Sequence, residues 1–172
     1  MKVKIDEKRY SLPELPENGQ AIAVSELPGT DNMLIFSLTK DEHNVERIHV
    51  YRAEKTGDCL ELRNRVGVCS ANKSKEMYNI YHYKVSDRYQ KKGIGETLLT
   101  LARERAIAHN SQEISFPAGI EHEKKTQFYQ ERGLKPKEVA PYPPFRFQHR
   151  AKPEEVKPTT HLNFKWVGRR KK

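Results

Sequence analysis

The sequence predicts a single α/β domain followed by a basic, proline-rich arm. Short runs rich in apolar and β-branched residues fill positions 33–84, and after position 93 the apolar residues take the spacing of a helix. Another strand-like run and another helix-like run follow before position 134, so that strands and helices alternate as in α/β proteins. A chain of 172 residues suits one such domain and is too short for two independent enzyme domains.

Four runs in the first half of the chain predict strands: 33–38, 45–52, 59–68 and 77–84. Turn-forming residues separate them, so we expect an antiparallel meander. The fourth run is the richest in aromatic and β-branched residues, which favours a central strand. Alternation along this run puts two sets of side chains on opposite faces: Tyr81, Tyr83 and Val85 against Ile80 and His82. Three prolines and two glycines make helices doubtful in the first 30 residues.

The apolar pattern changes to a helical one at Ile94. Apolar residues recur from there at i, i+4, i+7 and i+8, which predicts an amphipathic helix. The helix should end near His109 and Asn110, because asparagine tolerates the left-handed conformation of a helix cap. Positions 114–116 then predict a short strand, and positions 121–132 predict a second helix closed by a glycine.

Most of the positive charge lies in the last part of the chain. Positions 135–172 hold 11 basic and three acidic residues, and so +8 of the formal net charge of +9. The same stretch holds six of the ten prolines, which interrupt helices and restrict strands to sheet edges. We therefore expect a domain over 1–139 and an extended basic arm over 140–172. Its cations and interleaved aromatic residues suit RNA or a ribosomal surface, and a solubilising tail docked by its aromatic side chains explains the same composition.

The sequence points to neither a metal site nor a membrane. Its two cysteines, Cys59 and Cys69, lack the paired spacing of a zinc site, and we expect both to be buried free thiols. No run approaches the roughly 18 apolar residues of a spanning helix, and the N-terminus has no apolar segment of the signal-peptide kind. We expect a soluble, cytoplasmic protein with no metal and no membrane partner.

The strongest chemical signal is the run QKKGIG at positions 90–95, between the predicted central strand and the predicted helix. Two glycines at a helix start let the backbone approach a phosphate, whose charge is favoured by the positive end of the helix. Two other phosphate-binding motifs are excluded. The third glycine of a dinucleotide fingerprint would fall at Leu98, and no G-x-x-x-x-G-K-[ST] run occurs. We expect a diphosphate cradle over 90–95.

This loop resembles the motif of the GNAT superfamily of acyl-CoA-dependent N-acetyltransferases, Q/R-x-x-G-x-G/A after a central strand. Gln90, Gly93 and Gly95 occupy the defined positions. A second element agrees, because the run FYQERGL at 128–134 resembles the family's Tyr-x-x-x-Gly-Phe segment on the next helix. The resemblance covers 77–134 and extends more loosely back to Met33. It implies a GNAT-like mixed, mostly antiparallel central sheet flanked by helices.

The resemblance also implies that acetyl-CoA is the acyl donor. In the family, the pantetheine arm adds to the exposed backbone of the central strand like an extra strand, and the diphosphate lies on the N–H groups of the loop. The cofactor contacts expected on this sequence are Lys84, Val85, Gln90, Lys91, Lys92, Gly93, Ile94 and Gly95. The two lysines would add positive charge at the diphosphate, or they are simply solvated. The reaction requires no metal.

Acetyl transfer to an amine needs a neutral nucleophile, a polarised carbonyl and an acid for the departing thiolate. By the resemblance, Tyr129 is the acid, and a backbone N–H of the central strand stabilises the oxyanion. Many relatives carry a carboxylate base on the central strand, whereas this chain has only Glu76 at its start. His82 can act as the general base, because histidine accepts protons near neutral pH. Alternatively, a chain of waters can carry the proton to bulk solvent in place of a side chain. A half-buried structural role for His82 is the alternative.

Two other features bear on activity. Glu121 and His122 begin the predicted second helix, and they either touch the acceptor or complement the helix dipole. Positions 117–119 read Pro-Ala-Gly, where the family often has an asparagine that helps to hold the cofactor.

We expect an N-acetyltransferase that moves the acetyl group of acetyl-CoA to a primary amine. The sequence does not identify the amine acceptor. The positive charge of the arm favours an amine on a protein or on an RNA-associated carrier. The alternative from another class is a non-catalytic GNAT-fold module that binds nucleic acid through the arm. The missing strand carboxylate and asparagine favour this module, whereas the glycine loop and Tyr129 favour the enzyme.

Overall fold

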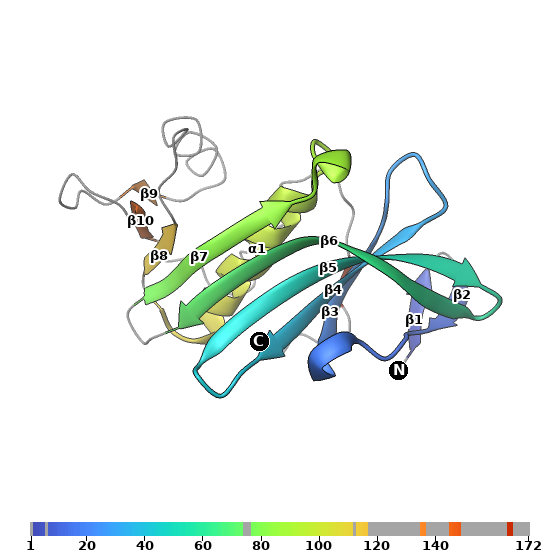
Figure 1. The fold of residues 1–172 in the computed structure, drawn as a ribbon, viewed down its shortest axis with the longest axis horizontal. Coiled ribbons are helices and arrows are strands. Elements are labelled where there is room, and N and C mark those ends of the chain that lie inside the picture. The colour runs from blue at the N-terminus through green and yellow to red at the C-terminus, as the bar shows by residue number, and fades with distance from the viewer. Residues whose placement is uncertain are drawn as a thin grey trace.

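The computed structural model describes residues 2–5, 7–73, 77–111 and 113–115, and the backbone of Phe116 and of three short strands nearer the C-terminus. Figure 1 shows a large twisted sheet with one long helix against it. The strands are β1 (Lys2–Ile5), β2 (Lys8–Ser11), β3 (Gln20–Glu26), β4 (Met33–Lys40), β5 (Val45–Thr56), β6 (Cys59–Lys73), β7 (Met77–Val85), β8 (Glu113–Phe116), β9 (Lys135–Pro136), β10 (Phe145–Gln148) and β11 (Lys165–Trp166). The helix is α1 (Ile94–Ala108), and two short 3-10 helices are η1 (Pro16–Asn18) and η2 (Asp87–Tyr89).

The sheet is mixed and mostly antiparallel, as predicted. Its strand order is β11-β3-β4-β5-β6-β7-β8-β10-β9, and the β1–β2 hairpin joins it at β6. Strands β3 to β7 follow one another as an antiparallel meander, whereas β7 and β8 are parallel. Parallel neighbours need a crossover connection, and α1 provides it. The connection from β7 to the start of α1 runs through η2 and residues 90–93.

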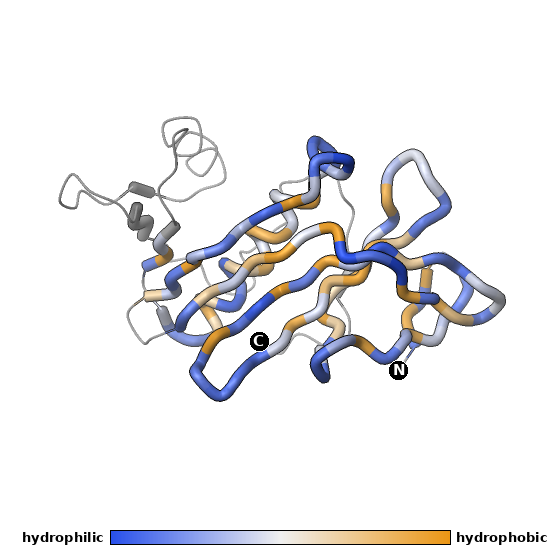
Figure 2. The backbone as a smooth tube through the Cα atoms, in the orientation of Figure 1, coloured by the Kyte–Doolittle hydropathy of each residue, from blue (hydrophilic) through white to orange (hydrophobic). Residues whose placement is uncertain are grey.

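The main core lies between α1 and one face of the sheet. Figure 1 shows the helix behind the central strands. Ile94, Leu98 and Leu101 of the helix are buried in one cluster with Phe36 and Ile80 of the sheet. Figure 2 shows hydrophobic residues along the central strands and hydrophilic residues at the turns, which matches this burial. The apolar stripe that predicts the helix is therefore the face that packs on the sheet.

The predicted central elements are confirmed, with longer strands than expected. The runs that predict four strands and the later short strand correspond to β4, β5, β6, β7 and β8. Helix α1 ends where the sequence predicts, with His109 at the C-cap and Asn110 at a left-handed φ of 57°. Strands β5 and β6 run on as a long hairpin beyond the predicted bounds, because their pairing continues to its tip. The second helix, predicted over 121–132, lies outside the described residues.

A second core lies at the far end of the long hairpin, where β1 and β2 pack. Val3, Ile5 and Tyr10 are buried there in one cluster with Ile35 and Leu60. The sequence analysis does not predict β1, β2 or β3, which are short runs in the first 30 residues. Their strand structure depends on partners that are distant in the chain.

The two cysteines differ in exposure. Cys69 is buried, as expected, but Cys59 is exposed. The expectation of two buried thiols is therefore wrong for Cys59. It begins β6 directly after the hairpin turn, where the sheet has little to cover it.

Strand β7 contains a β-bulge that changes which side chains share a face. The pairing of β7 with β6 skips Tyr81, which is the extra residue of the bulge. Ile80 is fully buried in the core beside α1, and Tyr83 and Val85 pack against the same core. The expected separation of Ile80 from Tyr83 and Val85 is therefore wrong. A bulge reverses the alternation beyond it, which a period of two cannot reveal.

Candidate functional site

Strand β7 has one paired edge and one largely open edge. On one side, β6 pairs with it as far as Val85. On the other side, β8 pairs with it only at Met77, Tyr78 and Asn79. Among the residues that the structure describes, positions 80–85 have no neighbouring strand on that side, and we call them the open edge. Backbone N–H and C=O groups at such an edge can bind an extended ligand as they would bind another strand.

The bulge lies at the start of the open edge and brings two exposed side chains there. Tyr81 is 41% exposed, and His82 is exposed as well. The Oη atom of Tyr81 accepts a hydrogen bond from Nη2 of Arg47 at 3.3 Å, across β6. The exposure of His82 does not fit the half-buried structural role that the sequence leaves open. Its side chain is instead accessible to a ligand at the open edge.

Strand β7 leads through η2 into the glycine loop, residues 90–95. The N–H of Ser86 donates to the carbonyl of Val66 at 2.9 Å, which holds the chain as it leaves the strand. The side-chain Nε2 of Gln90 donates to the carbonyl of Val85 and to Oδ1 of Asp87, each at 3.1 Å. These contacts fold the loop back onto the end of β7. The side chain of Gln90 therefore positions the loop, and the loop's backbone is left to face a ligand.

The loop turns sharply into α1 through left-handed backbone. Gly93 is the N-cap of α1 and has a φ of 90°, and Lys91 has a φ of 61°. Residues other than glycine rarely adopt such values, so the glycine is required at the cap. No side chain of the described residues caps the helix. The first N–H groups of an α-helix find no acceptor within it and carry partial positive charge, which suits a phosphate.

The second glycine of the loop lies against Tyr83. The hydroxyl of Tyr83 donates a hydrogen bond to the carbonyl of Gly95. A Cβ atom added at Gly95 would lie 3.2 Å from that hydroxyl oxygen, closer than nearly all real contacts of this kind. The first turn of α1 is therefore fixed directly to β7. Sequence reasoning misses this role of Tyr83, because only the bulge turns its side chain towards the helix.

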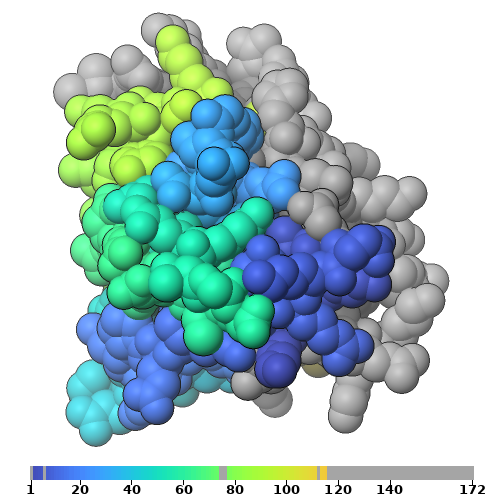
Figure 3. All heavy atoms as spheres, turned by 90° about the vertical axis from the view of Figure 1, so that its right-hand side faces the viewer, coloured from blue at the N-terminus to red at the C-terminus, as the bar shows by residue number. Residues whose placement is uncertain are grey.

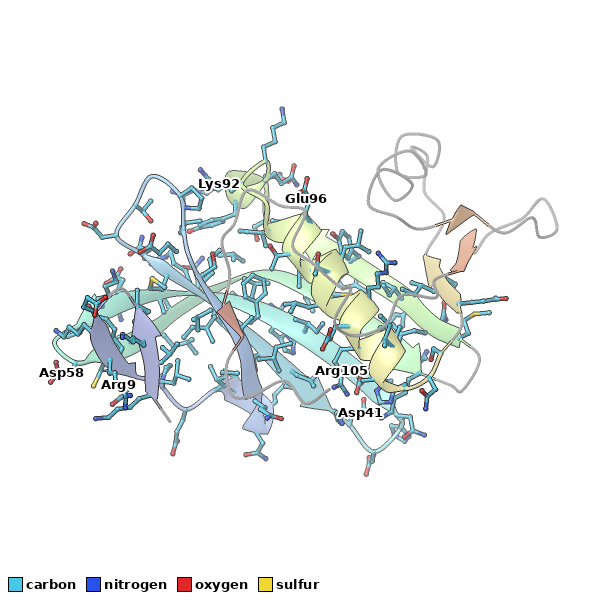
Figure 4. The ribbon with its side chains drawn as sticks, turned by 180° about the vertical axis from the view of Figure 1, so that it is seen from behind. Arg9, Asp41, Asp58, Lys92, Glu96 and Arg105 are labelled. Carbon is cyan, nitrogen blue, oxygen red and sulfur yellow. The ribbon has the colours of Figure 1, made fainter. Side chains whose placement is uncertain are left out.

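Positive side chains surround the glycine loop. Arg88 and Lys91 are exposed, and Lys92 is half-buried. Figure 4 shows Lys92 and Glu96 at the N-terminal end of α1. None of the ion pairs among the described residues involves Arg88, Lys91 or Lys92. Their charge is therefore available to attract an anionic ligand.

A buried ion pair fixes the other end of α1. Glu46 of β5 is fully buried, with Oε2 2.8 Å from Nη2 of Arg105 and 3.0 Å from Nε2 of His109. Figure 4 shows Arg105 near that end of the helix, and Tyr78 donates to Oε1 of Glu46 at 3.1 Å. Burial raises the pKa of Glu46, but the hydrogen bonds and charges of Arg105 and His109 outweigh it and lower the pKa to about 2. The helix that presents the loop is thus held at both ends.

The structure brings the predicted cofactor residues together. Lys84 and Val85 lie at the end of the open edge, and residues 90–95 follow directly after η2. Lys84 is exposed and Val85 is half-buried against the core, and the carbonyl of Val85 is the one that accepts from Gln90. These residues therefore follow one another along the stretch of chain from the end of β7 to the start of α1.

Other predicted site residues lie outside the described part of the chain. They are Tyr129, Glu76, Glu121, His122 and positions 117–119. Within the described part, no group of three or more His, Cys, Asp or Glu side chains is placed to hold a metal ion. No helix in that part has the length and apolar character needed to cross a membrane.

Comparison with known families identifies the family of this chain. Residues 25–134 match the model of the acetyltransferase (GNAT) family. The matched range begins within β3 and contains β7, the glycine loop, α1 and β8. No curated protein matches the chain.

Solved structures with similar folds include three acetyltransferases. A GNAT family acetyltransferase from Elizabethkingia anophelis with acetyl-CoA bound is 15% identical, covering 60% of this chain and 74% of that chain, with a TM-score of 0.45. The PaiA N-acetyltransferase of Thermoplasma acidophilum, in complex with coenzyme A, is 15% identical, covering 61% of each chain, with a TM-score of 0.42. The spermidine/spermine N-acetyltransferase SpeG of Vibrio cholerae, in complex with manganese ions, is 16% identical, covering 62% of this chain and 65% of that chain, with a TM-score of 0.45. The match thus covers less than two thirds of the last two proteins.

Proposed function

Because the chain belongs to the acetyltransferase (GNAT) family, we propose that it transfers an acetyl group from acetyl-CoA to a primary amine. One observation carries the proposal: the open edge of β7 runs through η2 directly into a glycine loop at the start of α1. This arrangement offers an extended backbone and a positive helix end to one bent, anionic ligand. Acetyl-CoA has both parts that such a surface suits, a peptide-like pantetheine arm and a diphosphate.

The donor binds through backbone more than through side chains. Backbone groups at Lys84 and Val85 pair with the pantetheine arm, and N–H groups between Lys91 and Gly95 hold the diphosphate. The positive φ angles of Lys91 and Gly93 support this role, because they bend the chain around the helix start. The set of donor-binding residues predicted from the sequence also includes Gln90, Lys92 and Ile94.

The proposed chemistry uses three groups: a backbone N–H of β7, Tyr129 and His82. A backbone N–H of β7 stabilises the oxyanion that forms when the amine attacks the thioester carbonyl. Tyr129 protonates the departing thiolate, since a phenol stays protonated at neutral pH and can donate its proton. His82 accepts the proton from the amine. Its exposed position, one residue after the bulge, supports this assignment.

The acceptor is an amine on a protein or on an RNA-associated carrier. This part of the proposal rests on the charge of positions 135–172, which hold +8 of the net +9. Docking on RNA or on a ribosomal surface through 140–172 would bring such an amine to the protein. The other function that the same charge favours is a non-catalytic module that binds nucleic acid through the arm.

A binding and turnover experiment separates the two functions. Calorimetry measures the affinity for acetyl-CoA, and release of free thiol is followed with peptides, ribosomal proteins, charged tRNA and small amines as acceptors. The enzyme binds acetyl-CoA and releases thiol with at least one acceptor class, and Tyr129→Phe abolishes the release without abolishing the binding. Tyr10→Phe, in the N-terminal hairpin, is the control variant.

The non-catalytic binding module predicts different results in the same experiments. Salt-sensitive RNA binding that is lost on truncation after Val139, with no thiol release from any acceptor, assigns a binding module. Failure to bind acetyl-CoA at all removes the transferase proposal.

A further inference from the structure

The face of the sheet opposite α1 carries polar side chains beside the open edge. The pairing of β5, β6 and β7 puts Arg47, Ser70 and His82 in one row across the sheet. Ile48, the next residue of β5, is buried in the core with α1, so this row points to the other side, which faces the viewer in Figure 1. Lys84 lies two residues beyond His82 on β7 and therefore on the same face.

Tyr81, the extra residue of the bulge, belongs to the same face. Its hydroxyl accepts the hydrogen bond from Nη2 of Arg47 at 3.3 Å, across β6. Tyr81, His82 and Lys84 are exposed, and Arg47 is half-buried. We call Arg47, Tyr81, His82 and Lys84 the polar face. An amine that gives its proton to His82 lies beside these side chains.

The polar face is positive. None of the ion pairs among the described residues involves Lys84. Arg47 pairs with Asp41, but its Nη1 lies 3.4 Å from Oδ2, longer than the roughly 2.7–2.9 Å of a strong pair. Oδ1 of Asp41 also accepts from the N–H groups of His43 and Val45, at 2.8 and 3.0 Å. This carboxylate is therefore shared with the turn, and the guanidinium keeps donors for another anion.

A buried histidine on the same face responds to this charge. Nδ1 of His49 lies 3.4 Å from Nη1 of Arg65, and it accepts that hydrogen bond because a guanidinium only donates. Burial lowers the pKa of His49, and the charges of Arg65 and Arg47 lower it further. The carboxylate of Glu17, 3.7 Å from Nε2, acts in the opposite direction but does not reverse the shift. The electrostatic potential on this face therefore favours anions.

The spacing of the cations matches an extended peptide. Neighbouring strands lie about 4.8 Å apart and a strand rises about 3.4 Å per residue. Arg47, two strands from His82, and Lys84, two residues from it, thus have Cα atoms about 10 Å and about 7 Å from that of His82. Acidic side chains one or two residues from a reacting amine span the same distances. A polyamine carries positive charge alone and is repelled here.

A carboxylate suits this face better than a nucleic acid does. Binding of single-stranded RNA combines cations with several aromatic rings on which successive bases stack. Tyr81 is the one large hydrophobic side chain of the described residues that is exposed, so the face offers no series of rings. The planar guanidinium of Arg47 fits a carboxylate through two parallel hydrogen bonds.

We propose that the amine acceptor is part of a polypeptide and is flanked within two residues by acidic side chains, which Arg47 and Lys84 bind. The inference rests on the proposed function, because it takes His82 as the base that the amine approaches. Arg47 and Lys84 then determine acceptor specificity and take no part in proton transfer.

The test compares three peptides that differ only in the charge beside the amine. Each has a blocked N-terminus and one lysine, flanked on both sides by Glu, by Gln or by Arg. Thiol release by the full chain is measured at a fixed concentration of acetyl-CoA. We expect kcat/KM to fall in the order Glu, Gln, Arg, with the Glu peptide at least about fivefold above the Gln peptide, as two partly exposed ion pairs give. The difference should lie in KM and shrink at high salt.

Variants locate the preference on the polar face. The ratio of the rates with the Glu and Arg peptides is compared within one variant, so that changes in donor binding or in folded fraction cancel. Arg47→Gln should lower this ratio, and Lys84→Glu should lower it further because it reverses a charge.

Two further variants separate charge from a structural role at the bulge. Arg47→Lys keeps the charge, and Tyr81→Phe removes only the hydrogen bond to Arg47, so both should retain most of the ratio. Arg9→Gln is the matched control, because Arg9 is an exposed cation on β2. Figure 3 shows the β1–β2 hairpin beside the β5–β6 hairpin, at the end of the molecule that Arg9 marks in Figure 4.

Each result has one meaning. Equal rates with the three peptides, or a faster rate with the Arg peptide, overturn the inference and leave the proposed function standing. A preference for the Glu peptide that survives both Arg47→Gln and Lys84→Glu also overturns it, because the polar face is then not its source. Equal rates together with competition by a short RNA oligonucleotide would assign the face to nucleic acid and overturn it as well.

The proposed function fails in a different way. Thiol release with charged tRNA or small amines, but with none of the peptides, overturns the inference alone. No thiol release with any amine removes the proposed function, and this inference with it.

Discussion

The hydroxyl of Tyr83, on β7, donates a hydrogen bond to the carbonyl of Gly95, in the first turn of α1. This bond joins the two elements that the proposed donor site needs, the open edge and the helix start. It exists because the bulge at Tyr81 turns Tyr83 towards the helix, and because Gly95 has no side chain to keep the ring away.

Removing the hydroxyl should loosen the loop without removing any proposed ligand contact. Tyr83→Phe is expected to raise the dissociation constant of acetyl-CoA several-fold and to lower the free energy of unfolding by about 1 kcal/mol, the usual value of one hydrogen bond. Calorimetry and chemical denaturation measure the two quantities. Tyr81→Phe is the control, since its hydroxyl contacts Arg47 instead. An unchanged affinity in Tyr83→Phe would show that the bond does not position the loop.

The effect of the left-handed backbone at Gly93 on ligand binding can be measured separately from its effect on stability. Gly93→Ala should destabilise the fold by about 1–2 kcal/mol, because a Cβ atom is unfavourable at its φ of 90°. Gly57→Ala, at a φ of 61° with open space around it, should have a similar cost in the β5–β6 turn. Only Gly93→Ala is expected to weaken acetyl-CoA binding. If both variants weaken binding equally, the effect follows from lost stability and not from the loop.

The buried ion pair predicts a pH-dependent contribution to stability. The pKa of Glu46 is about 2 in the folded protein and 4.5 as the reference value for the unfolded chain, which corresponds to about 3 kcal/mol at neutral pH. Because the folded pKa is the lower one, this stability is present above pH 4.5 and is lost as the pH falls towards 2. Glu46→Gln should therefore be destabilised at pH 7, and its difference from the parent should shrink through that window.

Denaturation curves measured between pH 7 and pH 2 check this prediction. Glu61→Gln, an exposed pair partner of Arg63, should change the free energy of unfolding by less than about 0.5 kcal/mol. A constant difference between parent and Glu46→Gln over the whole pH range would contradict the assigned pKa.

The proposed base has a kinetic signature. His82→Gln should lower kcat by about a hundredfold or more and leave the KM for acetyl-CoA unchanged, because the side chain acts on the amine. His43→Gln, in the exposed β4–β5 turn, is the matched control. An unchanged rate would mean that His82 is not the base and that a chain of waters removes the proton.

Thiol labelling tests the two cysteine environments. Burial raises the pKa of Cys69 to about 12, so this thiol should not react near pH 8, whereas Cys59 is exposed. An aromatic disulfide reagent is expected to modify one thiol rapidly in the native protein and the second only after unfolding. Cys59→Ser should abolish the rapid phase. Rapid reaction of both thiols would contradict the buried position of Cys69.

The sequence by itself determines the local elements and the loop. The helical spacing from Ile94, the end at Asn110 and the glycine pair at 93 and 95 are properties of neighbouring residues, and the structure has each of them as predicted. The order of strands β4 to β8 follows for the same reason, since each run is bounded by its own turn signals.

Only the tertiary structure decides the features that depend on distant partners. The bulge at Tyr81 comes from the pairing of β7 with β6, and it alone determines that Tyr83 meets Gly95. The open edge depends on how far β8 pairs along β7, and a pocket beside η2 joins residues from the β3–β4 turn, β5, β6 and the segment around η2. A sequence pattern records which residues a strand contains, but register and contact are set by the free energy of packing the whole sheet.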